Sequence, residues 1–149
     1  MLKFSIALAS LAMTIALPAT ALADPGRPAA LTVTVSGIKS TKGKLIACLW
    51  KDGAGFPTCQ KSKTALRQMP AVTGAMMKIS FTGLPAGRYA LTVQHDENGD
   101  GKLQRNFIGM PTEGVGVSNN PGGMPGYQKS LVTIGTGTSI AVTMRYLFG

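Results

Sequence analysis

Residues 75–93 read AMMKISFTGLPAGRYALTV, and this stretch decides the fold class. Apolar and polar side chains alternate on both sides of Leu84-Pro85-Ala86-Gly87, which is typical of strands with one buried face. Because proline fixes φ and glycine permits a positive φ, these four residues predict a type II turn. We expect Tyr89, Leu91 and Val93 to share the buried face of the second strand.

Other parts of the chain carry the same alternation. Further strands are predicted over Leu31–Val35, Lys44–Trp50, Ser130–Ile134 and Thr138–Tyr146. The first two are expected to form one hairpin and the last two another. The segment Gln60–Met69 fits either a helical turn or an extended edge strand. The pattern predicts an all-β fold, an antiparallel Ig-like or transthyretin-like β-sandwich of about seven strands.

The composition of the 149-residue chain fits one domain with a hydrophobic core. Hydrophobic residues make up 44% and charged residues only 14%, which argues against both a disordered polyelectrolyte and an amphipathic helical bundle. The aromatic residues lie on or beside predicted strands, so we expect them in the core: Trp50, Phe81, Tyr89 and Tyr146.

The first 23 residues read as a secretory signal peptide, with Lys3, a short apolar run and an Ala-Leu-Ala ending. An uncleaved anchor is the alternative. Cleavage leaves a flexible lead-in over residues 24–29 and a single domain over residues 30–149. It removes one Lys and no acid, so the net charge falls from +9 to +8. We expect an exported protein of the periplasm or the extracellular medium.

The chain has two cysteines, Cys48 and Cys59, with ten residues between them. An oxidising compartment favours a disulfide that staples this loop to the strand it leaves. The alternative, a pair of redox-active or metal-binding thiols, usually needs closer spacing or more Cys and His ligands.

Four segments together resemble the secreted bacterial family DUF2141: LPAGRYA at 84–90, HDENGDGKL at 95–103, GMPTEG at 109–114 and SNN at 118–120. The resemblance extends over roughly Leu31 to Tyr146. It implies a seven-stranded, prealbumin-like β-sandwich of uncharacterised biochemical role. Family members often carry an Asp after the Lys-Leu pair, where this chain has Gln104-Arg105, so whatever that carboxylate contributes is weakened here.

A candidate calcium site follows the Leu84–Val93 region. Oxygen ligands at alternate positions, Asp96, Asn98 and Asp100, precede a glycine and match half of an EF-hand loop. Phe107 occupies the twelfth position, so this is not an EF-hand, and Glu113 is the candidate for the missing carboxylate. The alternative is a pair of tight turns at Asn-Gly and Asp-Gly that need no ion.

His95, the only histidine, is a candidate general base in a hydrolase. Asp96 or Glu97 would orient it, and Ser118 would be a distant nucleophile. No G-x-S-x-G motif is present in the chain. A histidine hydrogen-bonded at the end of a strand is the alternative.

Seven basic residues and one acid lie between positions 39 and 67. This candidate anion-binding patch consists of Lys39, Lys42, Lys44, Lys51, Lys61, Lys63 and Arg67. On an exported domain it predicts attraction to lipopolysaccharide, phospholipid or another anionic envelope component, and not to nucleic acid, because no aromatics alternate with the basic residues. The alternative is a solvated surface.

These features together predict a monomeric, non-catalytic binding or envelope-interaction module with no cofactor except possible Ca²⁺, whose partner is such a component or another exported protein. We expect its working surface at the end of the sandwich that bears the 96–101 turn and the long loop 109–126, which holds six glycines and three prolines. A hydrolase using His95, or a purely structural envelope protein, is the alternative.

Overall fold

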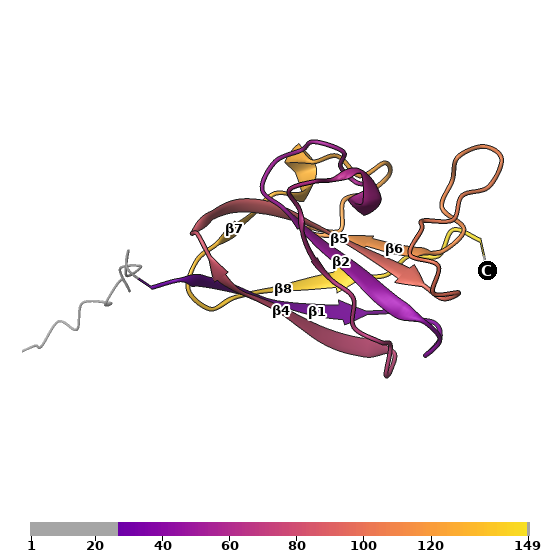
Figure 1. Cartoon of the computed structure of the whole chain (residues 1–149), viewed down its shortest axis with the longest axis horizontal. Helices are drawn as coiled ribbons and strands as arrows, with labels where there is room; N and C mark the ends of the chain where they lie inside the picture. The colour runs from indigo at the N-terminus through magenta and orange to yellow at the C-terminus, as the bar shows by residue number, and fades with distance from the viewer. Residues whose placement is uncertain (1–26, 149) are drawn as a thin grey trace, which may run out of the picture.

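The structure is a computed structural model that describes residues 27–148, so the predicted signal peptide lies outside the described residues. Eight strands form two facing sheets, and the helical elements among the described residues are two three-residue 3-10 turns, η1 (Cys59–Lys61) and η2 (Gln128–Ser130). The two layers are visible in Figure 1. The predicted all-β sandwich is confirmed. Within residues 27–148 no helix is long and apolar enough to span a membrane.

The smaller sheet has three strands, with β1 (Ala29–Ser36) between β4 (Met76–Leu84) and β8 (Thr138–Thr143). β1 runs antiparallel to β4 but parallel to β8, so the sandwich is not wholly antiparallel. The burial of β1 alternates strictly, as its sequence predicts. The strand begins at Ala29, the last residue of the predicted lead-in, and this residue is buried. Residues 24–26 of that lead-in lie outside the described residues.

The larger sheet has the strand order β3 (Leu66–Gln68), β2 (Lys44–Trp50), β5 (Gly87–Asp96) and β6 (Gly114–Val117). A short strand, β7 (Val132–Ile134), pairs with the first part of β5. The segment Gln60–Met69 was predicted to be either a helical turn or an extended edge strand. It contains both, the last residues of η1 and then the edge strand β3.

The two predicted hairpins are wrong, because each pair of consecutive strands is divided between the sheets. β1 pairs with β4 and β8, whereas β2 pairs with β3 and β5. β7 pairs with β5 and not with β8. The seven residues Gly37–Gly43 are long enough to cross from one layer to the other, which a two-residue turn cannot do. The type II turn is also wrong in detail, because the glycine with positive φ is Gly83 and not Gly87.

The main core fills the space between the sheets. Tyr89, Leu91 and Val93 of β5 face it, as the alternation predicts, and each is at most 2% exposed. The inward residues of the neighbouring strand β2 are Leu45, Ala47 and Leu49. β1 and β8 supply the opposing side chains. Phe81 also belongs to this core, and Tyr146 packs against it.

A second, smaller hydrophobic cluster lies on the outer face of the larger sheet. It contains the outward residues of β2 and β5 together with one loop cysteine: Ile46, Cys48, Trp50, Ala90 and Cys59. Phe56 and Tyr127 pack over it from loops, and Phe56 makes edge contacts with the rings of Trp50 and Tyr127. β2 is therefore buried on both faces, one covered by strands and the other by loops.

The sandwich closes tightly where β6 faces the C-terminal segment. A Cβ atom on Gly114 would lie 2.4 Å from Cε1 of Tyr146, and one on Gly116 would lie 2.6 Å from Cγ1 of Val142. Only glycine lets the β6 backbone approach this closely. The isolated bridge between Val115 and Arg145 ties the two segments together.

Candidate functional site

The 96–101 segment is a turn organised by the side chain of Asp96, which is fully buried. Its Oδ1 accepts the Gly99 N–H at 2.8 Å and its Oδ2 accepts the Gly101 N–H at 2.8 Å. The Lys44 Nζ lies 3.6 Å from Oδ2. Both carboxylate oxygens of Asp96 are thus engaged by the backbone of the loop that they shape.

The exposed residues of this turn also bond within it. The side-chain Oδ1 of Asn98 accepts the Asp100 N–H, and Oδ1 of Asp100 accepts the Lys102 N–H. The Lys102 N–H lowers the pKa of Asp100, and the side-chain amides of Asn98 and Gln104 act in the same direction. These contacts are the hydrogen bonds expected of consecutive tight turns.

Glu113 reaches the same end of the larger sheet from the segment before β6. Its Oε2 accepts Nε2 of Gln94 at 2.8 Å and the Gln104 N–H at 3.2 Å. Burial raises the pKa of Glu113, although these two hydrogen bonds oppose the shift. Gln94 also donates to the Lys102 carbonyl and accepts from Gln60, so its amide links the turn to the stapled loop.

The calcium hypothesis stays a prediction. Within residues 27–148 no three His, Cys, Asp or Glu side chains are grouped in a way that could hold a metal ion. The oxygens of Asp96, Asn98, Asp100 and Glu113 point toward amide donors. These are the hydrogen bonds of the tight-turn alternative, and they leave a further lone pair on the accepting oxygens, so they fit either hypothesis.

His95 is fully buried at the end of the main core. Its Nε2 lies 2.9 Å from the Lys42 carbonyl oxygen and its Nδ1 lies 2.7 Å from the Tyr146 hydroxyl. A carbonyl only accepts, so Nε2 carries a proton and donates to Lys42. Oε1 of Glu97 also lies 3.6 Å from Nδ1. Burial raises the pKa of Tyr146. Both ring nitrogens are therefore engaged inside the protein.

Ser118 has a structural role at the other end of β6. Its hydroxyl accepts the Leu91 N–H and donates to the Ser130 carbonyl, and the side chain is fully buried. Leu91 and His95 are four residues apart on β5, which corresponds to about 13 Å along a strand. Ser118 and His95 are too far apart for a nucleophile and its base.

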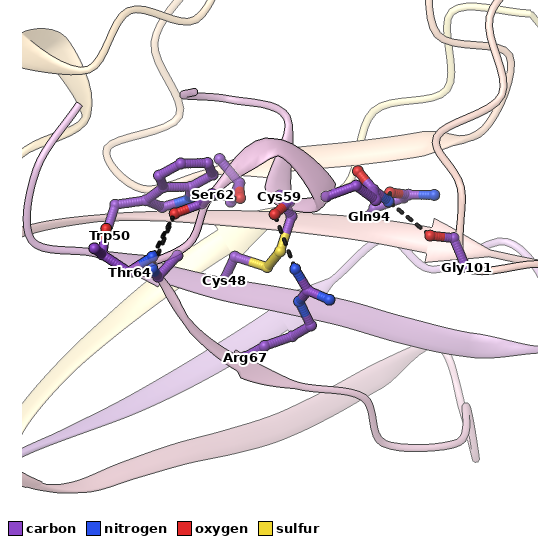
Figure 2. Close-up of a disulfide and its surroundings, with 11 residues drawn as sticks. Cys48, Trp50, Cys59, Ser62, Thr64, Arg67, Gln94 and Gly101 are labelled. Carbon is purple, nitrogen blue, oxygen red and sulfur yellow. Dashed lines mark hydrogen bonds between the residues drawn. A yellow bond between two sulfur atoms is a disulfide. The ribbon is translucent and has the colours of Figure 1, made fainter. Parts of the chain in front are cut away.

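The predicted disulfide between Cys48 and Cys59 is present, with the two Cα atoms 6.1 Å apart. Figure 2 shows how it holds η1 against the outer face of β2. Nη2 of Arg67 donates to the Cys59 carbonyl at 2.9 Å, and Nε1 of Trp50 donates to Oγ1 of Thr92 beneath the loop. The staple thus fixes a loop over the second hydrophobic cluster.

The structure divides the predicted basic patch between the two ends of β2. Lys39, Lys42 and Lys44 precede or begin this strand, and Lys51 follows its last residue. The seven steps from Lys44 to Lys51 span about 23 Å, which is more than the Debye length of about 8 Å at physiological salt. The side chains of Lys44 and Arg67 donate hydrogen bonds to backbone carbonyls of the protein. The ammonium group of Lys39 lies over the Tyr146 ring. Whether this patch binds anions stays a prediction.

A groove of about 420 Å³ lies on the outer face of the larger sheet, beside the stapled loop. Its floor comes from outward residues of β2, β5 and β6: Ile46, Thr92, Gln94, Val115 and Val117. One wall is the stapled loop with Pro57, Cys59 and Gln60. The other walls are residues 103–111, residues 120–125 and the C-terminal residues Arg145 and Leu147.

The groove is apolar in the middle and cationic at its margin. The two polar side chains of the floor are hydrogen-bonded within the protein: Thr92 accepts from Trp50, and Gln94 donates to Glu113 and to the Lys102 carbonyl. No lining residue is acidic, and the charged ones are Arg105 and Arg145. The prediction of one long loop over residues 109–126 is wrong, because β6 (Gly114–Val117) lies within this range. The parts before and after β6 supply residues 109–111 and 120–125 to the walls.

The residues of the groove floor, unlike residues 109–126, were not among the sequence candidates. A signal was available, because Leu45–Trp50 is an unbroken apolar run of six residues. A strand that is apolar on both faces needs a cover on each side, as central strands of layered folds do. This run therefore predicts that something other than the second sheet packs on the outer face.

The chain is thus a two-layer β-sandwich with an apolar groove on the outside of its larger layer. Residues 33–141 match the family described as "Uncharacterized protein conserved in bacteria (DUF2141)", and the chain belongs to this family. The resemblance read from the sequence is confirmed. The comparisons with curated proteins and with solved structures found no match.

Proposed function

We propose that this protein is a non-catalytic binding module of the bacterial envelope, and that its groove holds an elongated apolar ligand. The observation that carries the proposal is the groove itself, an apolar space of about 420 Å³ over Ile46, Val115 and Val117. Ligand sites for small molecules are typically concave, mostly apolar and about 300 to 1,000 Å³ in volume. A disulfide-bonded fold is compatible with export to an oxidising compartment.

The floor and walls of the groove are better suited to ligand binding than to catalysis. Pro57, Pro111 and Pro125 contribute rigid apolar surface, and the disulfide holds one wall in place. A preformed site loses less conformational entropy on binding than a flexible one. The hydrolase alternative has less support, because His95 does not line the groove and both of its ring nitrogens are engaged.

A neutral fluorescent probe, N-phenyl-1-naphthylamine, tests the proposal. We expect saturable binding to the protein with increased emission. The substitution Val117→Phe fills the floor of the groove and is expected to weaken binding at least tenfold. The matched control is Thr133→Phe on β7, an exposed strand position outside the groove lining, which should leave binding unchanged.

Two results would overturn the proposal. One is the absence of saturable binding to the unmodified protein, which would favour the purely structural alternative. The other is equal loss of probe binding in the Val117→Phe and Thr133→Phe variants, which would place the probe elsewhere. Thermal melts of both variants establish that each remains folded during the titration.

A further inference from the structure

Large apolar side chains are exposed around the groove. Eight such residues in the described part of the chain are at least 48% exposed, and five of them belong to the segments that form the groove walls or its C-terminal end. We call these five the groove rim: Phe107, Ile108, Met124, Leu147 and Phe148. A gathering of exposed apolar residues on a soluble domain usually marks an interaction surface.

Phe107 and Ile108 lie at the tip of an ordered turn. Arg105 and Pro111 form an isolated antiparallel bridge at its base. The side-chain oxygen of Asn106 accepts the N–H groups of Ile108 and Met110, and the Gly109 N–H donates to the Asn106 carbonyl. Phe107 is 99% exposed, so the turn displays its ring to the surroundings and buries none of it.

This turn belongs to the segment between β5 and β6, which projects beyond the sheets at the end near the C-terminus in Figure 1. The C-terminal residues Leu147 and Phe148 are each 48% exposed. Leu147 lines the groove together with Arg105 and Met124. The apolar rim therefore surrounds part of the groove mouth.

Two arginines accompany these apolar side chains. Arg105 donates to the Gly109 carbonyl, and Arg145 donates to the Asn120 and Pro121 carbonyls. Neither guanidinium group has a carboxylate partner within residues 27–148. Both are therefore unneutralised charges beside an apolar rim, and guanidinium is well suited to bind phosphate.

We propose that the groove rim docks on an anionic phospholipid surface. Phe107 and Ile108 enter the apolar layer, while Arg105 and Arg145 contact lipid phosphates. Apolar insertion and attraction to anionic headgroups act together in interfacial binding. The partner is chosen by charge complementarity, because the chain carries a net charge of +9 and the groove lining contains no acid. Docking would place the mouth of the groove against the lipid.

Flotation with vesicles tests the proposal. We expect the protein to bind phosphatidylglycerol vesicles and to bind phosphatidylcholine vesicles much more weakly. The double variant Phe107→Ser with Ile108→Ser should bind at least tenfold more weakly. Its matched control, Leu66→Ser with Met76→Ser, removes exposed apolar residues of 49% and 64% exposure from elsewhere and should bind normally.

A second pair of variants tests the arginines. Arg105→Gln with Arg145→Gln should weaken binding by about fivefold for each charge removed and flatten its salt dependence. The matched control, Lys51→Gln with Lys63→Gln, removes the same charge from the basic segment 39–67 and should have a smaller effect. Equal losses in the two double variants would show general attraction by net charge and overturn the assignment to the rim.

The outcomes separate this proposal from the proposed function. Rim variants that lose vesicle binding but still bind the soluble naphthylamine probe support both proposals. In Val117→Phe, loss of probe binding with intact vesicle binding also supports both proposals, whereas unchanged probe binding in this variant would refute the groove ligand alone. Failure of the unmodified protein to float with anionic vesicles overturns lipid docking, and concentration-dependent association that Phe107→Ser abolishes would reassign the rim to a contact between two copies.

Discussion

The inner face of the larger sheet packs against a second sheet, whereas the outer face of the same strands packs against loops and a disulfide. On the inner face, Leu45, Leu91 and Val93 are at most 1% exposed and belong to the main core. On the outer face, Ile46 is 3% exposed but borders a groove of about 420 Å³. Two strands can thus be buried on both sides while only one side is closely packed.

The difference follows from what covers each face. Side chains from a facing sheet interdigitate at regular spacing and fill the space between the layers. The cover of the outer face comes from segments rich in glycine and proline, which have few long side chains to insert. A cover of this kind excludes water from Trp50 but leaves an open apolar groove over Ile46.

The largest expected effect is truncation on the inner face. Leu91→Ala should lower the free energy of unfolding by about 2 to 5 kcal/mol, because it leaves a cavity in a closely packed core. Ile46→Ala should lie near the lower end of that range, because the groove already adjoins this side chain. Urea denaturation measures both. An equal or larger loss for Ile46→Ala would contradict the contrast between the faces.

Removal of the staple is expected to have the next largest effect. Cys48→Ala with Cys59→Ala should lower the free energy of unfolding by about 2 to 3 kcal/mol, because the unfolded chain loses a short closed loop. The native-state fluorescence of Trp50 should shift to longer wavelength, since the loop that covers it is released. Unchanged Trp50 emission in the native variant would mean that the loop stays in place without the disulfide.

Glycine substitutions test the close approach of the β6 backbone to the C-terminal segment. Gly114→Ala should lower the free energy of unfolding by about 1 to 3 kcal/mol, because its Cβ would collide with the Tyr146 ring. Gly122→Ala, in a groove-side loop where nothing lies within 4 Å, is the matched control and should stay within about 0.5 kcal/mol. Similar melting temperatures for the two variants would contradict the close approach.

The smallest expected effect concerns pH. Burial raises the pKa of Glu113, so the folded state holds the proton more strongly than the unfolded chain does. Stability therefore falls as pH rises from the unfolded pKa of Glu113, about 4.3, to its raised value in the folded state. Glu113→Gln should remove this slope while its amide oxygen still accepts from Gln94. Melting temperatures across acidic pH test this, and an unchanged slope would be evidence against it.

The layer structure could be predicted from alternation, and the strand partners could not. The run Leu31–Val35 fixes which side of β1 is buried, because the period of two is set by strand geometry. Pairing depends on whether a connection turns back within a sheet or crosses to the other one. Residues 37–43 are compatible with either kind of connection. The local pattern therefore predicts the two strands correctly but pairs them with each other, whereas they lie in different sheets.

The candidate site shows a similar limit. The residue types in Asp96-x-Asn98-x-Asp100 fit an ion or a turn equally well. The structure shows a turn in which the Asp96 carboxylate accepts the Gly99 and Gly101 N–H groups, and the sequence does not specify these contacts. The groove could not be predicted because its walls come from segments far apart in the chain. Arg105 and Arg145 meet around it only after β6 has paired with β5.

The parallel pairing of β1 with β8 has a practical consequence for handling the protein. Because the two strands run in the same direction, the start of β1 and the end of β8 lie at opposite ends of the sandwich (Figure 1). A tether joined ahead of Ala29 would leave the groove mouth free to face a sensor surface or a bilayer. A purification tag after Phe148 would lie beside the mouth of the groove and obstruct it.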